Sequence, residues 1–140
     1  MLNNFLKPIK LPNAADWAVL ILRVGISLLM ITHGYAKLTK FMSGDHSFGN
    51  PIGIGEELSL ILTIGAEFFC SILLIIGLAS RAVLIPLLFT MLVVLFIVHA
   101  NDPFDKKEHA LLFIIPYITL LFTGPGRFSF DKFLYACQQV

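Results

Sequence analysis

Four long apolar segments constrain the fold of this chain more than any other feature. They span residues 17–35, 58–79, 82–100 and 109–124, and short polar segments separate them. A helix needs about 20 apolar residues to cross the hydrocarbon core of a bilayer, within a range of about 17–25. Charged residues make up only 14% of the chain, against about 25% in soluble domains. We therefore expect an all-α integral membrane protein, a four-helix bundle that forms one domain over residues 1–140.

Short amphipathic segments flank the bundle at both ends. Apolar residues recur at helical spacing in residues 1–13 and again in the tail from residue 129 to residue 140. This pattern predicts short helices that lie in the membrane interface. The two cysteines, Cys70 and Cys137, fall at different predicted depths, and we expect no disulfide between them.

The distribution of positive charge predicts the orientation. Four spans put both termini on one side, which carries five lysines and arginines outside the spans, against four on the other side. The positive-inside rule therefore favours cytoplasmic termini. The first apolar segment is too long for a signal-peptide core, so no cleaved leader is expected. The net charge of +1 gives no basic surface, so the expected partner is the lipid bilayer and not nucleic acid.

Two charges of opposite sign interrupt the apolar segments. Glu67 lies near the middle of the second segment and Arg23 lies within the first. A charge at the centre of a bilayer costs about 2.5–3.5 kcal/mol on insertion scales. We therefore predict that Arg23 and Glu67 pair inside the bundle. Two interpretations of Glu67 remain open: a structural ion pair, or a carboxylate that handles protons or a ligand.

Polar residues form a seam on each of the first two predicted helices. The first seam comprises Arg23, Ser27, Met30, Gly34 and Lys37. The second comprises Ser59, Thr63, Glu67, Cys70 and Ser71. Residues three or four apart share one face of a helix. Both seams should face the interior, because lipid offers no hydrogen bonds.

The four histidines fall on the predicted non-cytoplasmic side, at positions 33, 46, 99 and 109. His33 and His99 end their spans at similar predicted depth, and two facing histidines could hold haem or a metal. No C-x-x-C-H or H-x-x-H spacing supports this, so no metal ligand is assigned, and ordinary interfacial histidines are the alternative. Tyr117 lies within the fourth segment, where its hydroxyl needs a partner; a quinone contact is the alternative for it.

These residues together predict a polar site on the non-cytoplasmic half of the bundle. A histidine beside carboxylates suits proton transfer, and helix bundles build ligand sites between facing helices. We expect Glu67 and His33 to carry the chemistry. The ligand-binding residues expected around them are Arg23, Lys37, His99, Glu108, His109 and Tyr117.

Five short segments follow one another along the chain in a recognisable order and spacing. They are Arg23-Val-Gly25, His33-Gly34-Tyr35-Ala36-Lys37-Leu38, Glu67 with the later stretch 73–81, Glu108-His109-Ala110-Leu111-Leu112, and Gly124-Pro125-Gly126-Arg127-Phe128-Ser129-Phe130-Asp131. Over residues 17–131 the set resembles the DoxX family of small bacterial four-helix membrane proteins, which is related to the DoxD subunit of thiosulfate:quinone oxidoreductase. The residues of the family's motifs would fall on Arg23, His33, Gly34, Lys37, Glu67, Gly124, Gly126, Arg127, Ser129 and Asp131.

The resemblance implies a membrane-embedded, redox-associated subunit or accessory, linked to a quinone, in a bacterial inner membrane. It implies another membrane or periplasmic redox protein as partner, and it names no substrate. The alternative is a non-enzymatic transporter, scaffold or stress accessory with a structural Arg23–Glu67 pair. The last segment also has a physical interpretation: Gly-Pro-Gly ends the fourth span, and Ser129 caps the tail helix with Asp131 in its first turn. An oligomer remains open.

Overall fold

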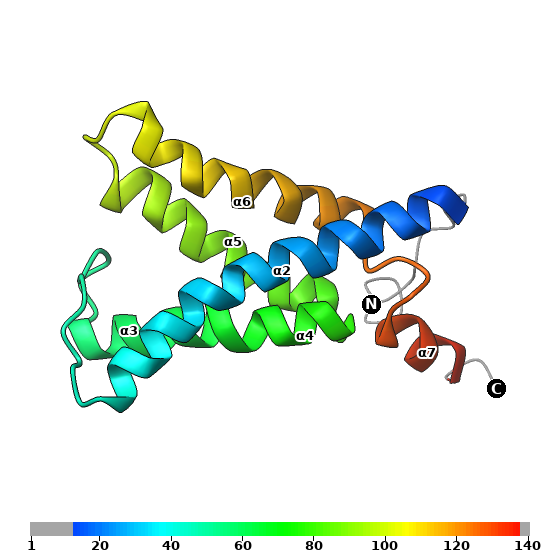
Figure 1. The fold of residues 1–140 in the computed structure, drawn as a ribbon, viewed down its shortest axis with the longest axis horizontal. Coiled ribbons are helices and arrows are strands. Elements are labelled where there is room, and N and C mark those ends of the chain that lie inside the picture. The colour runs from blue at the N-terminus through cyan, green and yellow to red at the C-terminus, as the bar shows by residue number, and fades with distance from the viewer. Residues whose placement is uncertain (1–12, 138–140) are drawn as a thin grey trace.

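The computed structural model describes residues 13–137, and helices account for all the regular structure in that range (Figure 1). The elements in order are α2 (Asn13–Met42), α3 (Glu56–Ile64), η1 (Gly65–Cys70), α4 (Ser71–Ile76), α5 (Ser80–Val93), η2 (Val94–Val98), α6 (Phe104–Thr123) and α7 (Phe130–Cys137). The segments η1 and η2 are π-helical. The all-α prediction is confirmed, while the predicted interfacial helix at residues 1–13 lies almost wholly outside the described residues.

Within residues 13–137, three helical stretches are long and apolar enough to cross a membrane. They are Asn13–Met42, Glu56–Ile76 and Ser80–Val98, and they correspond to the first three predicted spans. The fourth, α6, has 20 residues but carries Asp105, Lys106, Lys107 and Glu108 in its first turns. It packs along α5, as Figure 1 shows. That α6 is a fourth span stays a prediction.

Two helix boundaries differ from the sequence prediction. The first helix continues to Met42 instead of ending near Tyr35, because no proline or further glycine interrupts it there and Lys37 finds an acidic partner inside the bundle. Helix α6 begins at Phe104, directly after Pro103, whose ring fixes a backbone φ compatible with a helix start. The charged linker before the predicted fourth span is therefore largely helical.

Both polar seams face the interior, as predicted. Arg23, Ser27 and Gly34 of α2 are buried, and so are Glu67 and Ser71 of the second span. The two helices cross at Gly34, where a Cβ atom would lie 2.6 Å from the backbone nitrogen of Phe68 and 2.7 Å from the carbonyl carbon of Glu67. Only glycine allows this approach, which fixes Glu67 against α2.

The tail forms the predicted short helix, α7. Ser129 caps it, because the hydroxyl oxygen of Ser129 accepts a hydrogen bond from the backbone N–H of Lys132 at 3.3 Å. Phe130, Phe133 and Leu134 are exposed on its surface, as an interfacial helix requires. Cys70 is partly buried and Cys137 is exposed, and both are free thiols.

Candidate functional site

Arg23 does not pair with Glu67, and this prediction is wrong. Its Nη1 and Nη2 atoms instead donate hydrogen bonds of 2.6 Å each to the backbone carbonyls of Pro125 and Phe128. Gly34, which faces Glu67, lies eleven residues along α2 from Arg23, a distance of about 16 Å at about 1.5 Å per residue. The two charges are therefore too far apart along the helix. Arg23 holds the loop between α6 and α7 against the bundle.

Two buried carboxylates fasten the same end of the bundle. Asp131 accepts hydrogen bonds from the backbone N–H groups of Ala79 at 2.6 Å and Ser80 at 2.8 Å, and so caps the N-terminus of α5. Asp16 accepts one from the backbone N–H of Arg127 at 3.0 Å. Asp131 lies in the first turn of α7 as predicted, but its carboxylate serves another helix. This end of the molecule is a structural clamp.

Glu67 pairs with Lys37. The lysine Nζ lies 2.5 Å from the glutamate Oε2 atom, and the side chains are 25% and 3% exposed respectively. Because Lys37 lies one turn beyond Gly34 on α2, its amine reaches the carboxylate from the α3 side of the crossing. The pair joins an enclosed carboxylate to a partly exposed lysine, which gives Glu67 a polar connection to the surface of the bundle.

The backbone around Glu67 is itself unusual. Residues Gly65–Cys70 form a π-helical segment, in which hydrogen bonds run over one residue more than in an α-helix. Such segments are rare and occur frequently at functional sites. Here the segment widens the turn that carries Glu67 at the point where α2 crosses.

A row of aromatic rings leads from two histidines toward Glu67. His33 of α2 and His109 of α6 contact each other edge to face, with ring centroids 5.0 Å apart. Phe113 lies 5.4 Å from His109, and Tyr117 lies 6.2 Å from Phe113. Both histidines are exposed. Tyr117 is fully buried and interacts electrostatically with Glu67.

The structure thus brings together five of the eight predicted site residues: Glu67, Lys37, His33, His109 and Tyr117. Arg23 belongs to the clamp at the other end. Glu108 is exposed in the first turns of α6.

His99 pairs with an acidic residue three positions further along the chain. Its Nδ1 atom lies 2.7 Å from the carboxylate of Asp102, so the ring that faces His33 is His109, and a shared haem or metal site at His33 and His99 is not supported. Within residues 13–137, no three or more His, Cys, Asp or Glu side chains gather closely enough to hold a metal ion.

The loop between α2 and α3 is held by contacts with the ends of these two helices. Lys40 donates a hydrogen bond of 2.6 Å to the carbonyl oxygen of Ser47, and His46 lies 3.1 Å from the carboxylate of Glu57. Hydrogen bonds from the side chain and backbone of Ser47 lower the pKa of Asp45. These contacts order the loop beside the end of α2.

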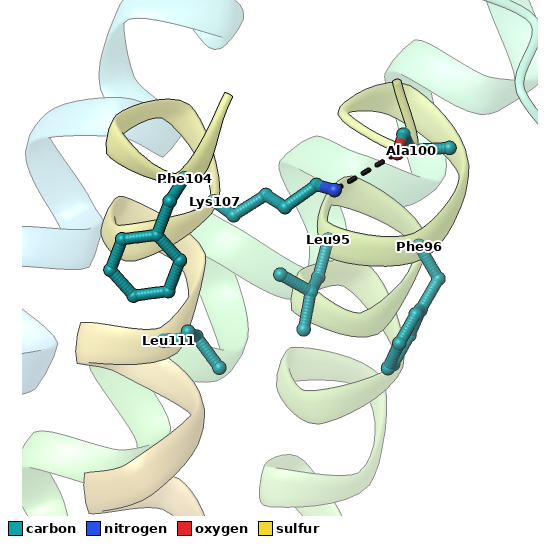
Figure 2. A pocket seen from close by; sticks show the side chains of 6 residues that line it. All are labelled: Leu95, Phe96, Ala100, Phe104, Lys107 and Leu111. Atoms are coloured by element: carbon teal, nitrogen blue, oxygen red, sulfur yellow. Dashed lines mark hydrogen bonds between the residues drawn. The ribbon is translucent and has the colours of Figure 1, made fainter. Parts of the chain in front are cut away.

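A separate apolar pocket lies between η2 and the start of α6. Its volume is about 210 Å³, and Figure 2 shows its lining by Leu95, Phe96, Ala100, Phe104, Lys107 and Leu111. The Lys107 amine donates a hydrogen bond of 2.9 Å to the carbonyl oxygen of Ala100. Lys107 thus ties the start of α6 to the turn that follows η2, and the apolar side chains of the lining suit contact with lipid chains.

Sequence reasoning missed the true partner of each buried charge. One signal was available for Lys37, because it belongs to the same seam as Gly34 and so faces the second span. No sequence signal pointed to the carbonyls of Pro125 and Phe128 as the partners of Arg23, since backbone groups carry no side-chain signature. Likewise, nothing in the sequence identifies Asp131 as the cap of α5.

The fold and site define a small helical membrane protein with a charged pair enclosed in its bundle. Residues 18–100 match the model of the DoxX family, and the chain belongs to that family. It is similar to the inner membrane protein YqjF of Escherichia coli strain K12, with 27% identity over 126 residues that cover 85% of this chain and 93% of the relative. No solved structure gives a significant match.

Proposed function

We propose that the protein is a redox-associated subunit or accessory of the bacterial inner membrane, with a polar site on the non-cytoplasmic half that exchanges protons for a quinone-linked reaction. The inner-membrane location is supported by the similarity to YqjF, which is named as an inner membrane protein. The quinone link is supported by the resemblance to the family of the DoxD subunit. Both termini are proposed to be cytoplasmic, from the distribution of lysine and arginine.

The Lys37–Glu67 pair is the observation that carries this proposal. A carboxylate that is only 3% exposed in the interior of a membrane bundle is a functional candidate by default. It sits in a π-helical segment and has a partner that reaches toward the outer end. Glu67 can hold a proton at Oε2 when Lys37 moves away, and Lys37 can return to the carboxylate when the proton leaves.

The exposed part of the site fits a quinone head group. His33, His109 and the partly exposed Lys37 offer hydrogen-bond donors where the helices meet, and a quinone presents two carbonyl acceptors. A bound quinone would supply the electron acceptor and require protons on reduction. In this proposal the two histidines orient the head group, and Lys37 and Glu67 hold the proton.

The first experiment asks whether the site holds a quinone. Protein purified from its native membrane is extracted with organic solvent, and quinones are quantified by mass spectrometry. We expect a quinone in the wild type and its loss in His109→Ala. His99→Ala is the matched control, because His99 binds Asp102 outside the site, and it should keep the quinone. A wild type without quinone, or equal retention in both variants, contradicts the proposal.

The second experiment separates a functional pair from a structural one. Removing one partner of a buried pair costs about 3–5 kcal/mol, because it leaves the other charge unpaired, whereas replacing both can be nearly neutral. Lys37→Met with Glu67→Met should therefore restore protein abundance relative to either single change. If the pair is functional, the double variant still fails to complement a deletion strain.

The alternative is a non-enzymatic transporter, scaffold or stress accessory whose charges are structural. The clamp around Arg23 favours it, because two nitrogens of that buried guanidinium donate to backbone carbonyls and hold the loop before α7 against the bundle. Under this alternative the double variant of Lys37 and Glu67 regains both abundance and complementation.

A further inference from the structure

Three buried hydroxyls near Glu67 have no hydrogen-bond partner within residues 13–137. They belong to Ser27 of α2, Ser71 of α4 and Tyr117 of α6, and each residue is fully buried. The hydroxyls of Tyr117 and Ser71 lie close together but without hydrogen-bond geometry. Leaving a buried polar group unsatisfied costs about 1–3 kcal/mol, and almost all such groups in folded proteins bind protein or ordered water.

Both serines belong to the inward-facing seams, and we call the row from Glu67 through Ser71, Tyr117 and Ser27 to Arg23 the polar path. Ser71 follows Glu67 by one helical turn, about 6 Å along the axis. Ser27 precedes Gly34, which faces Glu67, by about 10 Å. Beyond Ser27 comes Arg23, whose Nε atom is also buried without a partner in the described part of the chain. Polar atoms without partners therefore recur from Glu67 to the Arg23 clamp.

We propose that Ser27, Ser71 and Tyr117 bind a short chain of water molecules inside the bundle, which hydrates Glu67 from its α4 side and ends at Arg23. Buried water typically makes about three hydrogen bonds to polar groups that lack other partners, and this path supplies such groups from three helices. The role of the water in proton exchange rests on the proposed function; its presence does not.

The water gives Glu67 hydrogen-bond partners in both protonation states. Lys37 approaches from the α3 side and Tyr117 from α6, while α5 presents no ionisable group except Arg81 in its first turn. When Lys37 withdraws and Glu67 takes up a proton, water and the two nearby hydroxyls can accept and donate the bonds that the amine leaves. Within the chain each water accepts one proton and passes one of its own, so no hydroxyl is consumed.

Arg23 closes the path at the clamp end. Its guanidinium is buried and fixed by two carbonyls, and a fixed positive charge in a narrow path repels protons. Lys37, at 25% exposure, connects Glu67 to the outer end. Proton exchange of Glu67 then takes place only from the Lys37 end, which is the non-cytoplasmic side in the proposed topology.

Hydroxyl-radical labelling tests the water chain directly. Brief X-ray pulses convert bound water into radicals that oxidise neighbouring methionines, which mass spectrometry detects. Met30 lies between Ser27 and Gly34 on the buried face of α2 and is 1% exposed. Met42 is 77% exposed and serves as the positive control. We expect Met30 to be oxidised despite its burial, whereas protection of Met30 under pulses that oxidise Met42 overturns the proposal.

Hydroxyl-deletion variants link the labelling to this path. Tyr117→Phe and Ser71→Ala should each abolish the oxidation of Met30 and leave that of Met42 unchanged. Thr119→Val is the matched control, because the Thr119 hydroxyl is exposed and bonds to the carbonyl of Ile115; it should have no effect. Undiminished Met30 oxidation in both deletion variants overturns the assignment. Loss of quinone binding would leave these results unchanged, so the two proposals fail separately.

Proteoliposomes test whether Arg23 blocks the passage of protons. With an internal pH dye and a potassium diffusion potential set by valinomycin, the wild type should acidify the lumen no faster than protein-free vesicles. Proton flux that requires the hydroxyls, present in the wild type and absent in Tyr117→Phe, would show that Arg23 does not close the path.

Discussion

The crossing at Gly34 provides the sharpest test of how the bundle positions Glu67. In Gly34→Ala the new Cβ atom would meet the backbone nitrogen of Phe68 at 2.6 Å, where ordinary contacts begin at 3.4 Å. The helices must therefore separate by 3.4 − 2.6 = 0.8 Å at this point. Overpacking costs about 1–3 kcal/mol and occasionally more, and we take about 3 kcal/mol because the obstacle is backbone.

Gly25→Ala is the matched control on the same helix. A Cβ atom at Gly25 meets nothing within 4 Å, and both changes gain the same helix propensity of about 1 kcal/mol. The difference between the two variants is therefore the packing cost alone. For a chain of about this size, about 2–4 °C of Tm accompanies each kcal/mol. We expect Gly34→Ala to melt roughly 6–12 °C below Gly25→Ala.

Reaction of Cys70 with a thiol-reactive dye reports the melting. Cys70 is partly buried and Cys137 is exposed, so the assay uses a Cys137→Ser background in which dye fluorescence rises as the bundle opens. Equal melting temperatures for the two glycine variants would refute the close crossing. A lower Tm in Gly34→Ala, together with loss of quinone binding, would link the crossing to the Lys37–Glu67 geometry.

Four further predictions follow from single contacts. Arg23→Lys keeps the charge but cannot bond two carbonyls as a planar fork, so chemical unfolding should show a loss of about 1.5–3 kcal/mol; wild-type stability would mean the fork is dispensable. Asp131→Ala should cost about 1–2 kcal/mol through the lost cap of α5, and unchanged protection of the first α5 amides in hydrogen exchange would contradict this. His109→Ala should impair complementation at normal abundance, whereas His99→Ala should not; equal effects would remove His109 from the site. A cysteine at Ser47 should react with an impermeant reagent only from the non-cytoplasmic side, and labelling from the cytoplasm would invert the topology.

Much of the architecture could be predicted because the membrane imposes it locally. Apolar segment length predicts the helices, and seams such as that of Arg23, Ser27 and Gly34 predict which faces turn inward. Helix ends were less predictable, because the continuation of α2 to Met42 depends on Lys37 finding a partner on another helix. The tail capping by Ser129 was predictable, since a side chain three residues before a backbone N–H is a local pattern.

The partners of the buried charges were decided by the tertiary structure. The sequence determined that Arg23 and Glu67 would be buried, because each lies on a polar seam that lipid cannot satisfy. It could not determine their partners, since the side chains that a charged group can contact depend on where two helices cross. Gly34 places that crossing about 16 Å from Arg23 along α2. Glu67 therefore meets Lys37, and Arg23 meets the carbonyls of a loop more than a hundred residues away in the chain. Hydrophobic patterning fixes which face of a helix is buried, but the axial register between helices arises from close contacts among all of them.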